Sequence, residues 1–113
     1  MEDFDSIKDY HLEASIYMVE TEFGGRSTGV FDRYRGQFFW HINHVETTDW
    51  DASYYFEGGQ VAPGECTSCK IILSPNLIEC SKGRFSKGEQ FGIREGSRIV
   101  GVGTILSSKV KNA

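Results

Sequence analysis

The chain has 113 residues and a net charge of −4, with 39% hydrophobic and 25% charged residues. This length is enough for one domain with a real core and leaves no room for a second, catalytic domain. The acidic opening MEDFDSIKDY lacks the apolar centre of a signal peptide, and no stretch approaches the roughly 18 apolar residues of a membrane span, so we expect a cytoplasmic protein.

Charge is distributed unevenly along the chain. Residues 1–22 hold seven acids and one Lys, whereas residues 82–113 hold seven Lys or Arg and two acids. The negative net charge argues against non-specific nucleic-acid binding but leaves a basic surface patch open as an alternative. Our main interpretation is that solvated faces of opposite sign favour solubility. We expect residues 1–10 to form a flexible, acidic N-terminus.

Short β-rich runs separated by Gly, Pro, Asn and Asp predict an all-β domain, since no long 3.6-residue periodicity is present. Six short strands favour a small barrel or sandwich. In chain order, the predicted strands are residues 12–20, 37–45, 53–57, 67–73, 90–95 and 98–106.

Two segments in the first half of the chain differ from this simple strand pattern. The strand QFFWHINHV at 37–45 is partly apolar on both faces, which predicts a central strand. Residues 21–36 are predicted to form one long loop that carries Arg26, Arg33 and Arg35. Loops of this length without structure of their own usually carry function.

The segment EQFGIREGSRIVGVG at 89–103 predicts a hairpin around a two-residue turn at Gly96 and Ser97. Counting outward from this turn places four apolar residues on an expected core face: Phe91, Ile93, Val100 and Val102. The opposite face combines Gly92, Gly101 and Gly103 with Arg94 and Ile99. Its glycines indicate either barrel curvature or a smooth surface, bordered by Arg94, that accepts a flat partner.

Two Cys and His pairs raise the question of a zinc or redox site, CTSC at 66–69 and HINH at 41–44. On a strand, the i, i+3 spacing points two side chains to opposite faces, whereas metal ligands must converge. We therefore expect no metal site and three reduced thiols. Zinc stays open as an alternative only if Cys66 lies in the turn after APGE.

Catalytic signatures are missing from the sequence. There is no G-x-S-x-G elbow, no recognisable Cys/His signature and no G-x-x-x-x-G-K-[ST] loop of GTPases and ATPases. The residues that could be assembled into a site show no spacing that requires one: His41, His44, Asp49, Asp51 and Cys69. We expect a protein that is not an enzyme and uses neither a cofactor nor a nucleotide.

Four motifs in the same order resemble the C-terminal, third domain of elongation factor Tu: GGRST at 24–28, YRGQFF at 34–39, PG at 63–64 and GIREGSRIVGVG at 92–103. The resemblance covers residues 11–110 and implies a six-stranded antiparallel β-barrel. It also implies two sets of contact residues. Arg26, Gln37 and Gly96 correspond to positions that face tRNA, and Tyr34, Arg35 and Gln37 lie in the segment that faces the GTP-binding domain.

The chain departs from this family near the implied RNA contact. Ser27 stands where the family usually has His, and Gly29 and Gly36 stand where it has Pro, which makes the loop less rigid. Glu46 stands where the family offers a neutral Thr, and a carboxylate repels phosphate. This carboxylate weakens the implied RNA contact.

Two functional hypotheses follow, neither involving a membrane. The first is a stand-alone, non-catalytic module that engages translation-factor partners or the factor itself, one version being an immunity or decoy protein against a toxin. Its protein-binding residues are Tyr34, Arg35, Gln37 and Arg94. The alternative is a tRNA or double-stranded RNA-binding module that uses Arg26, Gln37 and Gly96 and weakens steeply with salt. A remnant that merely folds is the third reading.

Overall fold

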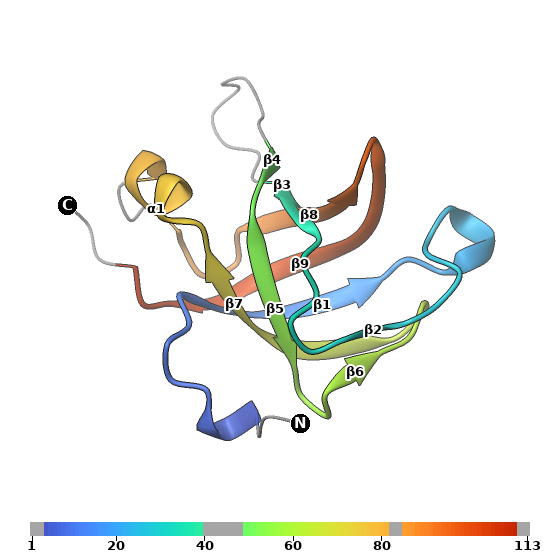
Figure 1. The fold of residues 1–113 in the computed structure, drawn as a ribbon, viewed down its shortest axis with the longest axis horizontal. Coiled ribbons are helices and arrows are strands. Elements are labelled where there is room, and N and C mark those ends of the chain that lie inside the picture. Colours follow the sequence, from blue (N-terminus) through green and yellow to red (C-terminus); the bar gives the residue numbers. More distant parts are fainter. Residues whose placement is uncertain (1–3, 40–48, 82–84, 111–113) are drawn as a thin grey trace.

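The computed structural model describes residues 4–39, 49–81 and 85–110, and the side chains of residues 49 and 80 are not described. This part of the chain forms strands with one short α-helix (Figure 1). The strands are β1 Leu12–Met18, β2 Val30–Phe31, β3 Gln37–Phe39, β4 Asp49–Trp50, β5 Ala52–Phe56, β6 Gln60–Val61, β7 Cys66–Leu73, β8 Gln90–Glu95 and β9 Arg98–Ser108. The α-helix is α1 Pro75–Ser81, and two 3-10 helices span Phe4–Ser6 and Thr21–Phe23.

The main sheet curls into a barrel-like shape. Its order is β4-β3-β8-β9-β1-β7-β5, and every pair is antiparallel. Only Asp51 separates β4 from β5, the two edge strands of this order. These two strands therefore count as one bent strand, and the sheet as six-stranded (Figure 1). The predicted all-β fold, a six-stranded antiparallel barrel, is confirmed.

Residues 32–34 complete the seam of the barrel along β5. The Arg33 amide donates to the Tyr54 carbonyl and the Tyr54 amide donates to the Tyr34 carbonyl, each at 2.9 Å. The Asp32 carboxylate accepts from the Phe56 amide at 2.8 Å. The predicted loop at 21–36 is therefore not structureless, since it contains a 3-10 helix, this seam and strand β2, which pairs with β6 in a separate ribbon.

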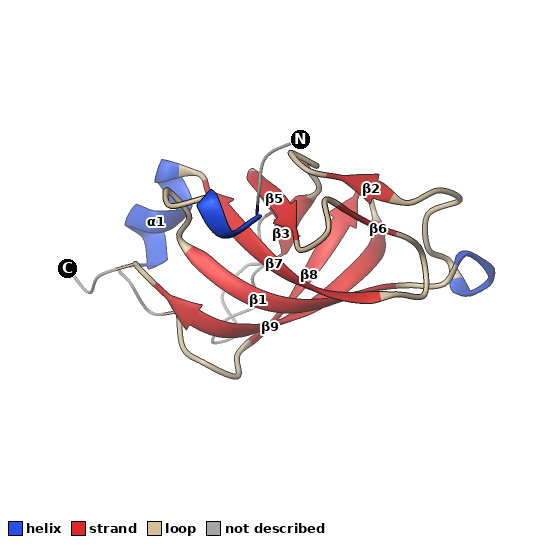
Figure 2. Cartoon of the chain, turned by 90° about the horizontal axis from the view of Figure 1, so that it is seen from below, coloured by secondary structure: helices blue, strands red, loops and turns tan. Residues whose placement is uncertain are grey.

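Aromatic rings fill the inside of the barrel. The Phe38 ring stacks on Phe91 at a centroid distance of 4.6 Å and meets the edge of Phe85 at 6.2 Å. Strand β3 confirms the predicted strand at residues 37–39, and the rest of that strand lies outside the described residues. The α1 helix and the β2–β6 ribbon lie at opposite ends of the molecule (Figure 2).

The α1 helix was not predicted. Its start is marked by Ser74, whose side-chain oxygen accepts from the Leu77 amide at 3.3 Å, and by Pro75 at the first helical position. A capping Ser followed by Pro is a start signal for a helix. Its apolar run was too short to show a helical period.

The hairpin of β8 and β9 keeps the predicted register only next to its turn. Glu95 pairs with Arg98 and Arg94 with Ile99 as counted, and Gly96 has a φ of 62°. A bulge then absorbs Val100, so that the following pairs are Ile93 with Gly101, Gly92 with Val102 and Phe91 with Gly103.

The bulge reverses the faces that counting had assigned to part of β9. Val102 is 45% exposed, whereas Gly101 and Gly103 are buried. A side chain at Gly103 would lie 2.3 Å from the Phe91 ring, so this glycine allows the barrel wall to approach a core ring closely. The prediction of a core-facing Val102 was wrong, and so was the placement of Gly101 and Gly103 on the outer face, because a one-residue shift exchanges the faces of a strand.

Residues 4–10 pack against the barrel. Lys70 is only 7% exposed, and its ammonium donates to the Phe4 carbonyl at 2.7 Å and the Ile7 carbonyl at 3.5 Å. The same ammonium lies 4.3 Å from the centroid of the Phe4 ring, and Ile7 is buried. We had expected a flexible tail ahead of a domain at 11–110; we propose instead that the folded unit begins at Phe4.

His11 is expected to make the stability of the fold depend on pH. Its Nδ1 accepts from the Leu73 amide at 2.9 Å, so the bonded imidazole is neutral, and burial lowers the pKa of His11 from its ordinary 6.5. As the pH falls below 6.5, the unfolded chain takes up this proton more readily than the folded chain, and stability is lost. We expect His11→Asn, which keeps an acceptor, to show a smaller loss than the parent between about pH 7.5 and about pH 5.5 in urea denaturation. Equal losses in both proteins would exclude this role.

Candidate docking face

An apolar row crosses the outside of four neighbouring strands. Phe39 on β3 pairs with Gly92 on β8, Gly92 with Val102 on β9, and Val102 with Tyr17 on β1. Directly paired residues share one face of a sheet. Ile99 lies beside this row and is 37% exposed. We call Tyr17, Phe39, Gly92, Ile99 and Val102 the docking face.

The centre of the docking face is hollow because Gly92 has no side chain. A Cβ placed there would lie 3.2 Å from Ile99 Cδ1 and 3.5 Å from Phe39 Cδ2. The hollow has a volume of about 490 Å³ and is lined by Phe39, Gln90, Phe91, Gly92, Ile99 and Val102. An apolar recess of this kind can take a side chain of a partner protein.

Polar residues border the docking face on one side. Gln37 pairs with Arg94 across β3 and β8, and the Arg94 guanidinium lies 4.9 Å from the centroid of the Phe39 ring. The structure thus brings together two of the four predicted protein-binding residues. Arg35 lies elsewhere and lines a different hollow with Asp51 and Pro75.

Tyr34 belongs to a polar cluster at the corner of the hairpin. The Arg26 guanidinium and the Tyr34 hydroxyl both donate to the same carboxylate oxygen of Glu95. The Arg26 guanidinium also lies 5.6 Å from the centroid of the Tyr34 ring. Burial and the hydrogen bond to Glu95 raise the pKa of Tyr34, so its hydroxyl stays protonated at neutral pH.

The same cluster reduces the ability of Arg26 to bind an RNA phosphate. Glu95 compensates the charge of Arg26, and Gly96, which the resemblance placed near tRNA, follows Glu95 in the chain. An Arg already paired with a carboxylate is a weaker phosphate partner than a solvated one. Sequence reasoning missed Glu95 because its partner Arg26 lies 69 positions away.

The described cysteines do not form a reactive pair. Cys66 and Cys69 are free thiols, and burial raises the pKa of Cys69, which disfavours its thiolate. Within residues 4–39, 49–81 and 85–110, no group of three or more His, Cys, Asp or Glu side chains is placed to hold a metal ion. His41, His44 and Glu46 lie outside these ranges. In the part of the chain that the structure describes, no helix has the length and apolar character needed to cross a membrane.

A comparison with protein-family models identifies the family of the chain. Residues 6–109 match the family model of the elongation factor Tu C-terminal domain. The match covers nearly all of the chain, which therefore belongs to this family. The resemblance carried by the four sequence motifs is confirmed, and the curled antiparallel sheet agrees with it.

Proposed function

We propose that this elongation factor Tu C-terminal domain is a non-catalytic binding module that takes a protein of the translation machinery on its docking face. The observation that carries the proposal is the exposed apolar row around the hollow at Gly92, with Ile99 and Val102 at its centre. Contiguous apolar surface of this kind marks interaction sites in soluble domains. Membership of the family supports a role in translation and a location in the cytoplasm.

The surroundings of the docking face favour a protein partner over RNA. RNA binding depends on cations that are available to phosphate. Arg94 borders the face and is stacked against Phe39, while Arg26 is paired with Glu95. An apolar side chain of a protein partner that enters the hollow fits these residues better than a phosphate backbone.

Two biological versions of the proposal share this docking face. The module engages a partner of elongation factor Tu, or it engages the factor itself. When it engages a partner, it competes with the intact factor for that partner, and one such version is an immunity or decoy protein against a toxin that uses the factor.

The proposal is tested by replacing Val102 with a charged residue. Binding of the chain to purified elongation factor Tu and to its nucleotide-exchange factor is measured by isothermal titration calorimetry. We expect Val102→Glu to weaken the complex about 100-fold, because burying an unpaired carboxylate in the interface would cost about 3 kcal/mol. Ser107→Glu adds the same charge to an exposed position on the same strand and is expected to bind like the parent.

The same proteins decide between the proposal and its alternative. Failure of both factors to bind at about 10 μM, or unchanged affinity of Val102→Glu, would contradict the docking proposal. The RNA alternative predicts instead a gel shift of tRNA that weakens steeply with salt, that Arg26→Ala reduces and that Val102→Glu leaves intact.

A further inference from the structure

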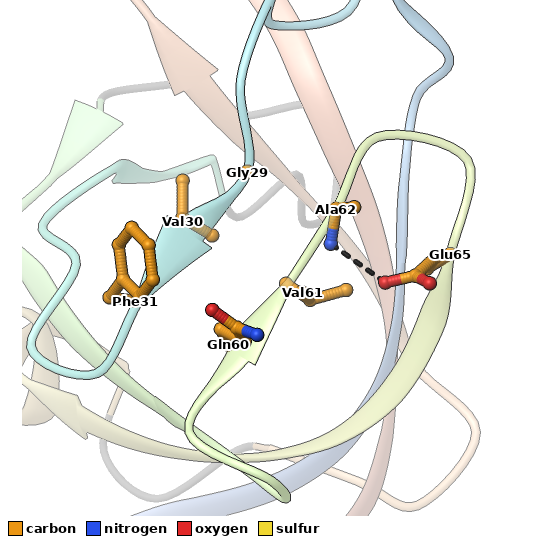
Figure 3. Close-up of a pocket in the computed structure, with 7 residues that line it drawn as sticks. All are labelled: Gly29, Val30, Phe31, Gln60, Val61, Ala62 and Glu65. Atoms are coloured by element: carbon orange, nitrogen blue, oxygen red, sulfur yellow. Dashed lines mark hydrogen bonds between the residues drawn. The ribbon is translucent and has the colours of Figure 1, made fainter. Parts of the chain in front are cut away.

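A further hollow lies beside the β2–β6 ribbon (Figure 3). It has a volume of about 320 Å³ and is lined by Gly29, Val30, Phe31, Gln60, Val61, Ala62 and Glu65. These residues come from the two ribbon strands, Gly29 ahead of β2 and the turn that follows β6. None of them belongs to the docking face.

The turn at 62–65 gives this hollow a fixed wall. The Glu65 amide donates to the Ala62 carbonyl at 3.1 Å, and the Ala62 amide donates to a Glu65 carboxylate oxygen at 2.9 Å (Figure 3). The turn is also tied to β1, because the Met18 amide donates to the Glu65 carbonyl at 3.0 Å. A wall held from both sides is preformed, which lowers the entropic cost of binding.

Phe31 gives the hollow its exposed apolar surface. Val30 and Val61 pair across the ribbon and are buried in the core. Phe31 stands beside them with 66% of its surface exposed. An aromatic ring at the mouth of an apolar recess contributes to stability only when another group covers it, which favours a binding role.

The charge at the rim specifies the chemistry of the occupant. The Glu65 carboxylate is oriented by the Ala62 amide, and the Glu20 side chain lies at the same turn, its Cγ 3.1 Å from where a Cβ on Gly64 would be. No Lys or Arg is among the residues that line the hollow. Glu65 is the one charged side chain among these lining residues, in contrast to the docking face, which Arg94 borders.

We propose that this hollow is a second docking site, for a segment of a partner protein that carries a Lys or Arg next to an aliphatic or aromatic residue. The apolar side chain packs on the exposed Phe31 ring, and the cation meets Glu65. The site is independent of the docking face. It allows the module to hold two partners at once, one on each surface.

The test follows the backbone amides of the isotope-labelled, full-length chain by NMR while blocked tetrapeptides are added. The probe is acetyl-Lys-Leu-Lys-Leu-amide, with the Glu-Leu-Glu-Leu and Lys-Ser-Lys-Ser peptides as comparisons. We expect the first peptide alone to shift the amides of Phe31, Gln60 and Ala62. Phe31→Ser should weaken it about tenfold, and Glu65→Gln, which still accepts from Ala62, about threefold.

Any of the following outcomes would overturn the proposal. Absence of shifts at about 5 mM peptide means that the hollow binds no such segment. Equal binding of the acidic peptide removes the role of Glu65, and equal binding of the Lys-Ser peptide removes the role of Phe31. Shifts of the same amides that grow with protein concentration alone would assign the hollow to a second copy of this chain. Phe31 is largely exposed, and the spectrum of Phe31→Ser itself reports whether that variant folds.

Discussion

Gly103→Val is expected to lower the free energy of unfolding by about 3 kcal/mol. A Cβ at residue 103 would lie 2.3 Å from the Phe91 Cζ atom and within 2.8 Å of two further ring atoms. The Phe91 ring has no room to retreat, because it stacks on Phe38 at 4.6 Å. The wall of the barrel must therefore move or the stack must break.

Urea denaturation of three variants measures this effect. Thr104→Val, one position along the same strand, serves as the control and is expected to change the unfolding free energy by less than about 0.5 kcal/mol. Phe91→Ala removes the ring that clashes, so Gly103→Val should cost clearly less in that background than in the parent. If the two backgrounds lose the same stability, the cost does not come from the contact with Phe91.

Removal of residues 1–10 is expected to lower the free energy of unfolding by about 3 kcal/mol. The truncated chain loses the burial of Ile7 and the two carbonyl oxygens that receive the Lys70 ammonium. Hydrogen bonds from a charged donor are worth more than neutral ones, and the ring of Phe4 adds a cation–π contact. A detached tail would have no such effect.

Lys70→Met provides the matched test for this second prediction. In the Lys70→Met background the truncation should cost about 1 kcal/mol less than in the parent, because the contacts between Lys70 and residues 4–7 are already gone. The measurement is again urea denaturation of the four proteins of the cycle. A truncation that leaves stability unchanged would restore the flexible tail and place the start of the folded unit at residue 11.

Local patterns were enough to identify most of the barrel. The predicted strands at 53–57, 67–73, 90–95 and 98–106 coincide within two residues with β5, β7, β8 and β9. They are visible because β-branched and aromatic residues alternate between turn residues. Strands β2, β4 and β6 have two residues each, too few to show alternation. They exist because a partner strand is present.

The docking face was only partly predictable. Gln37 and Arg94 came from motifs, and the structure pairs them directly. Val102 was assigned to the core, because counting across a hairpin cannot detect the bulge at Val100. Nothing in the sequence indicated that Tyr17 belongs to this face, since its neighbour Val102 lies on a strand at the other end of the chain.

By itself, the sequence determined the strand pattern, the turn at Gly96 and the family, which follow from residues close together in the chain or from motifs in a fixed order. Only the tertiary structure decided which residues share a surface: the row from Phe39 to Tyr17, the pairing of Arg26 with Glu95, and the recess between β2 and the turn at 62–65. The physical reason is register. A strand exposes alternate residues, so one inserted residue exchanges inside and outside, and only packing against the neighbouring strands selects where that residue goes.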